Sequence, residues 1–164
     1  MESAPGETTS SSGAAGLLNG HGPRRATVAL GSSVPCARTR VAIAIEALGR
    51  HPLLNLIAAS DIEQTLGAGG ATLQPFANAA CVIETALGPS ALLRVLHALE
   101  ANAGRLRTRP LGPRCLDLDL LEVAGAPPMR GGGIRLPHPG CFAPYAAPTR
   151  LQALERAAAL SRHG

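Results

Sequence analysis

The chain contains no lysine, so all 15 of its Lys and Arg positions are arginine. Without lysine there is no GxxxxGK[ST] motif, which excludes a P-loop nucleotide site. The net charge of +4 is compatible with an anionic partner such as a nucleic acid or a nucleotide. A GC-rich coding bias explains the same abundance of Arg, Ala, Gly and Pro. The basic charge alone therefore does not identify a partner.

Aromatic residues are only 2% of the chain, and tryptophan is absent. The rings of Phe76, Phe142 and Tyr145 are too few for the stacking platform of a single-strand nucleic-acid binder. Long apolar runs are also missing, since no stretch approaches the roughly 18–20 residues that cross a bilayer. We therefore expect a soluble protein with neither a nucleic acid nor a membrane as its partner.

Cysteine is sparse and widely spaced, with no CxxC pair. This spacing argues against a zinc site and against a disulfide framework. We expect the cysteines to be small core residues in the reducing cytoplasm. They are Cys36, Cys81, Cys115 and Cys141.

The chain divides into an N-terminal extension and one domain. Residues 1–25 are rich in Ser, Gly and Ala, which predicts a disordered segment. This segment lacks the apolar centre of a signal peptide, and its Glu2 and Glu7 argue against a transit peptide. Residues 26–164 are long and apolar enough for a single globular domain.

Hydrophobic periodicity predicts the order strand, helix, strand, strand, helix, strand. This order fits an α+β ferredoxin-like fold, a split βαβ sandwich with an antiparallel sheet and helices packed on one face. Ser90 is placed to cap the second helix and Gly104 to end it. The predicted elements are strands over 26–32, 53–60, 76–87 and 115–123 and helices over 38–50 and 90–103.

Two Gly-rich segments, 66–75 and 126–140, are predicted as loops. A last helix is predicted from Thr149, because Thr149 and Gln152 have capping-box spacing. Its apolar face is assigned to Leu151, Leu154 and Ala158.

Aspartate is the scarcest acidic residue, yet two of the three, Asp117 and Asp119, share the stretch "CLDLDLL". Residues i and i+2 of a strand face the same side, roughly 6.5–7 Å apart. Two such carboxylates can bind a pair of Mg²⁺ ions about 4 Å apart for phosphoryl chemistry. The alternative is an ordinary half-exposed strand with polar residues facing outward.

Four arginines lie within 105–114, directly before this strand. Arginine suits bidentate phosphate contacts, and phosphoryl transfer needs cations to offset charge on the transferred oxygens. A solvated loop in an arginine-rich chain is the alternative interpretation.

The paired aspartates and four other segments together resemble one family, 6-hydroxymethyl-7,8-dihydropterin pyrophosphokinase (HPPK) of folate biosynthesis. The resemblance covers about residues 26–140 in order. The segments are "VALGSS" (28–33), "PFANAACVIET" (75–85), "ALEANAGRLR" (98–107), "GPRCLDLDLL" (112–121) and "LPHP" (136–139).

The resemblance implies a ferredoxin-like fold and transfer of the β,γ-diphosphate of ATP to the pterin hydroxymethyl group, leaving AMP. It implies that Asp117 and Asp119 hold two Mg²⁺ ions on the ATP phosphates. Arg105 and Arg114 would be the catalytic cations that stabilise the transferring group. Small-molecule substrates and a monomer in the cytoplasm are expected.

The resemblance also implies two sets of binding residues. The nucleotide would be bound by Glu100, Arg107 and His138. The pterin would be bound by Thr65, Phe76 and Asn78. Four of these residues also have a purely structural interpretation. It makes Glu100 a solvated helix residue, Phe76 a core residue, Asn78 a polar strand-edge group and His138 a plain loop residue.

The chain departs from the family pattern at four single positions and over residues 63–66, where "EQTL" replaces a Tyr-x-Thr-Pro-like stretch. It has Ser33 where the family usually has Asn, and Leu111 where Trp is common. After His138, Pro144 and Ala146 replace an arginine and an aromatic residue. These departures keep open a catalytically weak or inactive relative that serves as a nucleotide-binding or scaffold module.

Overall fold

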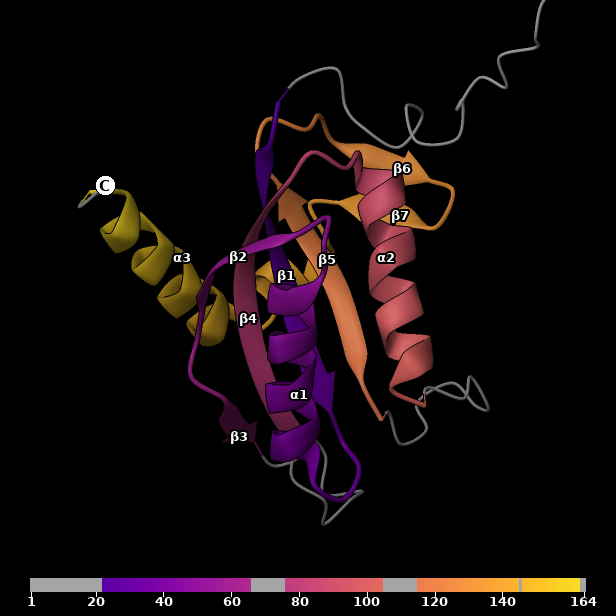
Figure 1. Ribbon diagram of the computed structural model, residues 1–164, viewed down its shortest axis with the longest axis vertical. Helices are drawn as coiled ribbons and strands as arrows, with labels where there is room; N and C mark the ends of the chain where they lie inside the picture. Colours follow the sequence, from indigo (N-terminus) through magenta and orange to yellow (C-terminus); the bar gives the residue numbers. More distant parts are fainter. Residues whose placement is uncertain (1–21, 66–75, 105–114, 145, 163–164) are drawn as a thin grey trace, which may run out of the picture.

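The computed structural model describes residues 22–65, 76–104, 115–144 and 146–162. Its strands and helices follow the predicted order and add a short strand and a hairpin (Figure 1). The elements are β1 (Arg24–Ser32), α1 (Ala37–Arg50), β2 (Asn55–Ala59), β3 (Glu63–Thr65), β4 (Phe76–Thr85), α2 (Pro89–Asn102), β5 (Asp117–Val123), β6 (Met129–Gly131), β7 (Ile134–Leu136), the 3₁₀ turn η2 (Pro139–Phe142) and α3 (Ala147–Ser161).

The main sheet has the strand order β2-β4-β1-β5, and β3 also pairs with β4. Every pair in it is antiparallel. The βαβ units are therefore split, because β4 lies between β1 and β2, and β1 lies between β4 and β5. This topology confirms the predicted α+β ferredoxin-like class.

The larger core lies between the sheet and the helices α1 and α2, which run side by side in front of it in Figure 1. Alternate residues of each strand enter this core, as the period of two requires. On β5, Leu118 at 2% and Leu120 at 4% exposure face inward. The helices contribute apolar stripes, which consist of Val41, Ile45 and Leu48 on α1 and of Leu92, Leu96 and Leu99 on α2, with Ile45 and Leu99 partly buried.

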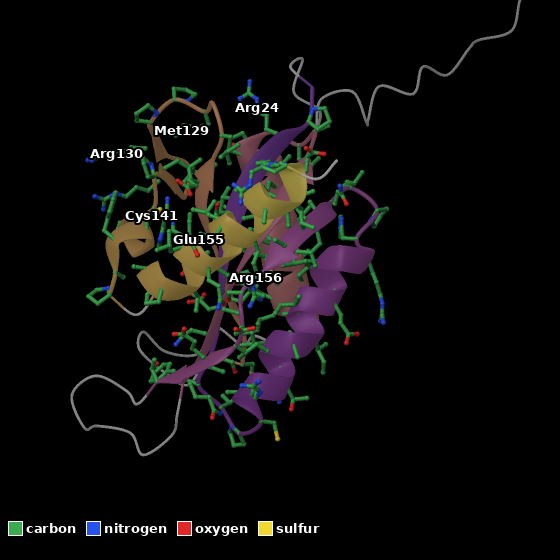
Figure 2. The ribbon with its side chains drawn as sticks, turned by 90° about the vertical axis from the view of Figure 1, so that its left-hand side faces the viewer. Arg24, Met129, Arg130, Cys141, Glu155 and Arg156 are labelled. Atoms are coloured by element: carbon green, nitrogen blue, oxygen red, sulfur yellow. The ribbon has the colours of Figure 1, made fainter. Side chains whose placement is uncertain are left out.

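The other face of the sheet is partly covered by α3, seen nearest the viewer in Figure 2. The contact is built from small side chains, which let the helix approach the strands closely. The prediction that the helices pack on one face of the sheet therefore holds for α1 and α2. Helix α3 packs on the other face and adds a third layer. The contact residues are Ala58, Ala80, Val82, Ala153 and Ala157.

The first helix begins at Ala37, within one residue of the prediction, but the predicted side-chain caps of the other two helices are wrong. α2 begins at Pro89 with Gly88 as its N-cap, and no side chain caps it, so Ser90 lies inside the first turn. Proline suits this position because its missing N–H would be unpaired there anyway. The end is as predicted, since Gly104 follows the helix with φ +83°.

In α3 the capping box is absent, because the helix begins at Ala147 rather than Thr149. The Thr149 hydroxyl donates to the carbonyl oxygen of Ala146 at 3.1 Å. The buried face consists of Thr149, Ala153 and Ala157, not the predicted apolar face, and Leu151 is 56% exposed. Ala158 is also exposed, and Leu154 is half-buried.

The predicted loop over 126–140 contains the β6–β7 hairpin, whose turn includes Gly132 and Gly133 at positive φ. β1 begins at Arg24, two residues before the predicted strand. Residues 1–21 and the predicted loop 66–75 lie outside the described residues.

The cysteine prediction holds for two of the four. Cys81 and Cys141 are buried, whereas Cys115 is half-buried and Cys36 is exposed at the start of α1. Burial raises the pKa of the Cys81 thiol to about 12, so it stays protonated at neutral pH. Within the described parts of the chain, no helix combines the length and apolarity that crossing a membrane requires.

Candidate active site

Asp117 and Asp119 lie on the face of β5 that points away from the leucine core, and both are half-buried. Their cross-strand neighbours on β1 are Gly31 and Ala29. The next strand places Asn78 beside Gly31. Directly opposite residues of an antiparallel pair share a face, so both carboxylates and the Asn78 amide lie on one face.

Gly31 keeps the surface between these groups open. A Cβ at this position would lie 3.5 Å from Oδ1 of Asn78, in van der Waals contact. With Ala29 as its neighbour on the same face, β1 provides a floor of small residues between the carboxylates and the amide. A flat ligand can therefore approach the backbone there.

The structure also brings together the three predicted pterin residues. Thr65 is opposite Phe76 in the β3–β4 register, and Asn78 is opposite Glu63. Nδ2 of Asn78 donates to Oγ1 of Thr65 at 3.0 Å. This bond fixes the amide orientation, and the half-buried Phe76 ring stands two residues away on the same strand face.

Glu100 is 2% exposed, so it is not a solvated helix residue. Its Oε1 accepts a hydrogen bond of 2.7 Å from the backbone N–H of Leu118, between the two aspartates. Because β5 is an edge strand, this N–H has no strand partner on its outer side. Glu100 thus holds the strand segment that carries Asp117 and Asp119.

A hollow of about 120 Å³ lies at the outer edge of β5, between α2 and the β6–β7 hairpin. It brings four predicted residues to one place, Glu100, Asp117, Asp119 and His138. Two polar residues that the sequence analysis missed, His97 and Arg135, also line it. His97 lies three residues before Glu100, and Arg135 lies three residues before His138. This spacing from a predicted site residue is the signal in the sequence that could have identified both.

His138 is held by hydrogen bonds that join its backbone and its ring to two backbone groups. Its backbone N–H donates to the carbonyl oxygen of Leu121 at 2.8 Å, and its Nδ1 accepts from the N–H of Gly140 at 3.1 Å. A Cβ at Gly140 would lie 2.9 Å from this Nδ1, so the ring requires glycine there. Because Nδ1 is engaged, Nε2 is the nitrogen suited to contact a ligand.

The predicted arginines Arg105, Arg107 and Arg114 lie outside the described residues, as does Leu111. The segment that holds them joins the end of α2 to the start of β5. Ser33 lies beside the same end of β5, since its neighbour Ser32 donates from Oγ to the carbonyl oxygen of Cys115 at 2.8 Å.

Asp117 and Asp119 fit the kind of magnesium site in which substrate phosphates and water supply the remaining ligands. Among the described residues no group of three or more His, Cys, Asp or Glu side chains could hold an ion by itself. Mg²⁺ typically binds through one or two carboxylates together with substrate phosphates and water. Two half-buried carboxylates on one strand face match that pattern, in which the ion arrives with the nucleotide.

The model of one protein family, 7,8-dihydro-6-hydroxymethylpterin-pyrophosphokinase (HPPK), matches residues 27–145. The chain belongs to this family. The matched segment includes both aspartates, Glu100, His138 and the Asn78 strand. α3 follows the matched segment, so it lies outside the part of the chain that the HPPK model describes.

Three bacterial relatives are each named 2-amino-4-hydroxy-6-hydroxymethyldihydropteridine pyrophosphokinase. The chain is 38% identical to the Methylorubrum extorquens protein over 62% of its own length and 65% of the relative. It is 38% identical to the Pseudomonas aeruginosa protein over 60% of each chain. Identity to the Pseudomonas putida protein is 39%, over 59% of this chain and 80% of the relative. The chain thus matches less than two thirds of the length of the first two HPPK relatives.

Proposed function

We propose that this protein transfers diphosphate from ATP to 6-hydroxymethyl-7,8-dihydropterin, giving the pterin diphosphate and AMP in folate biosynthesis. One observation carries the proposal. A member of the HPPK family places Asp117 and Asp119 on the same sheet face as the bonded pair Asn78 and Thr65. A metal-binding strand and a heterocycle-binding strand thus flank the bare Gly31 position, where two substrates can meet.

The nucleotide half of the site is assigned to the β5 edge. Asp117 and Asp119 would hold two Mg²⁺ ions, which would supply charge neutralisation for the ATP phosphates. Glu100 holds this strand through its hydrogen bond with the Leu118 N–H, and His138 lines the same hollow. Arg105 and Arg114 are proposed to neutralise the transferring diphosphate, and Arg107 to bind ATP.

The pterin half is assigned to β3 and β4. The Asn78 side chain is oriented by Thr65, so its Oδ1 is directed as an acceptor for the pterin N–H groups. Phe76 offers an aromatic face for stacking. Little covalent chemistry is required of the protein, because phosphoryl transfer depends on positioning and on charge neutralisation.

The proposed function is tested by AMP release. The purified chain is incubated with ATP, MgCl₂ and 6-hydroxymethyl-7,8-dihydropterin, and AMP and pterin diphosphate are quantified by chromatography. We expect equal amounts of both products, and none when the pterin or Mg²⁺ is omitted. Binding of an ATP analogue without any pterin-dependent AMP would instead indicate a nucleotide-binding relative without this activity.

The Asn78→Ala variant is expected to raise the KM for the pterin about ten-fold or more, since it leaves the pterin polar edge unpaired. The KM for ATP should stay near the parental value. Thr65→Val, which removes the orienting hydroxyl at similar volume, should give a smaller rise in the same constant. Equal changes in both KM values would contradict this division of the site.

We also propose that the protein acts as a monomer in the cytoplasm. The described cysteines are unpaired, which is usual in a reducing compartment. One chain supplies every residue assigned above.

A further inference from the structure

The segment between β2 and β3 contains one extra residue relative to its partner strand. Ala59 is opposite Cys81 and Glu63 is opposite Asn78, so this segment advances four residues while β4 advances three. We call this one-residue offset a β-bulge by its two-against-one count, and it follows a first register shift between Leu56 and Ala58 inside β2. Ser60 fills the gap in the ladder, because its N–H donates to Ala80 and its hydroxyl accepts from the Ala80 N–H at 3.0 Å.

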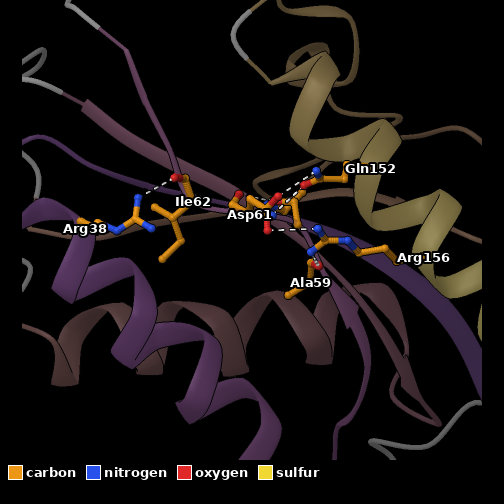
Figure 3. A network of polar contacts seen from close by, with 8 residues as sticks. Arg38, Ala59, Asp61, Ile62, Gln152 and Arg156 are labelled. Carbon is orange, nitrogen blue, oxygen red and sulfur yellow. Dashed lines mark hydrogen bonds and ion pairs between the residues drawn. The ribbon is translucent and has the colours of Figure 1, made fainter.

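Helix α3 holds this bulge from the side. Asp61 is its centre, lying between α3 and α1 in Figure 3. The Asp61 N–H donates to Oε1 of Gln152 at 2.6 Å, and Nε2 of Gln152 donates back to Oδ2 at 3.0 Å. Arg156 donates to Oδ1 of Asp61 at 3.0 Å and to the carbonyl oxygen of Ala59 at 2.8 Å.

The opposite side of the bulge is held by α1, where Arg38 donates to the carbonyl oxygen of Ile62 at 2.9 Å (Figure 3). Hydrogen bonds from Arg156 and Gln152, together with the Arg156 charge, hold the pKa of the Asp61 carboxyl below its usual value. The carboxylate is thus the form that the network favours.

The bulge decides which way Thr65 points. β3 is only three residues long, and such a strand has few contacts of its own to specify its register. A slip of one residue turns every side chain of a strand to the opposite face. A slip of β3 would therefore remove the Thr65 hydroxyl from Asn78 and present Gln64 in its place.

We propose that Gln152 and Arg156 of α3 are positioning residues for the pterin half of the site, acting through the Asp61 bulge on Thr65 and Asn78. The inference rests on the proposed function for its kinetic readout. It extends that function to a helix that follows the segment matched by the family model. The contact of α3 with the nucleotide strand β5 is a separate one, made by Arg150 on Glu122 toward the end of β5 that is farther from Asp117.

The test compares Gln152→Ala, Arg156→Ala and the double variant with a control on the same helix. Glu155→Ala removes an exposed side chain next to Arg156 without touching the bulge (Figure 2). We expect the KM for the pterin to rise roughly five-fold in each single variant and further in the double variant. The KM for ATP should be unchanged, Arg156→Lys should recover part of the loss, and Glu155→Ala should match the parent.

A second measurement does not depend on activity. Hydrogen exchange of peptides that cover residues 59–65 should accelerate in the double variant, while peptides from β1 and β5 keep their parental protection. Parental exchange over 59–65, or equal rises in both KM values, would overturn the inference. If the parent forms no AMP, the proposed function fails, and the exchange measurement still decides whether α3 holds the bulge.

Discussion

Asp117→Asn and Asp119→Asn are each expected to lower the rate of AMP formation at least about a hundred-fold. The amide keeps the size of the side chain and removes the negative charge that is proposed to bind Mg²⁺. Each variant should also need more Mg²⁺ for half-maximal rate, which a Mg²⁺ titration of AMP release measures. Both should remain folded, because the backbone ladder between β1 and β5 holds this strand.

The matched control is Glu84→Gln, the same chemical change on β4 at the far end of the sheet, opposite Arg25 in the register. Its rate and Mg²⁺ dependence should equal those of the parent. If either aspartate variant kept near-parental turnover, the carboxylates would be ordinary outward strand residues and the metal assignment would be wrong.

Glu100→Ala is expected to lower the free energy of unfolding by about 2 kcal/mol, because it leaves the buried N–H of Leu118 without its side-chain acceptor. For a chain of 164 residues this corresponds to a Tm lower by roughly 4–8 °C. Turnover should fall with it, since the unsupported N–H lies between the two aspartates. Thermal unfolding and AMP release measure the two effects.

Glu100→Gln separates the hydrogen bond from the carboxyl group. The amide oxygen can still accept from Leu118, so the loss of stability should be less than half of that in Glu100→Ala. Glu46→Ala is the control, since it removes an exposed helix carboxylate that pairs with Arg50 on the surface. A Tm for Glu100→Ala equal to that of the parent would show that the bond contributes nothing to holding β5.

The main elements were predictable because their periodicities are local. Val41 and Leu48 recur at helical spacing, and leucines alternate with aspartates on β5, so each pattern indicates both an element and its buried face. The order of these elements leaves few topologies, of which the split βαβ sheet is the one observed.

The remaining elements depend on contacts that are distant in sequence. β3 has no apolar alternation, and it forms only because β4 offers an edge. The predicted buried face of α3 was wrong because Ala153 and Ala157 are much less hydrophobic than Leu151. Their small side chains nevertheless fit closely against Ala58 and Ala80. The prediction of the α2 start was wrong because proline and glycine, rather than a capping hydroxyl, begin its first turn.

For the site, spacing along one strand was enough to pair Asp117 with Asp119, and Phe76 with Asn78. The cross-strand neighbours could not be read from the chain, because the register that aligns Asp117, Gly31 and Asn78 is set by two separate strand pairings. The role of Glu100 was also hidden, since its partner is a backbone N–H 18 residues away.

The alanine contact under α3 has a consequence for how this helix behaves. Methyl groups bury little apolar surface, so separating them from the sheet costs little hydrophobic free energy. A rim of polar ties, from Arg150 on Glu122 to Arg156 on Asp61, adds to this small apolar contact. Such ties weaken as salt rises, whereas the leucine core behind α1 and α2 does not. The molecule thus combines a body held by apolar packing with one outer layer that is held partly by salt-sensitive polar ties.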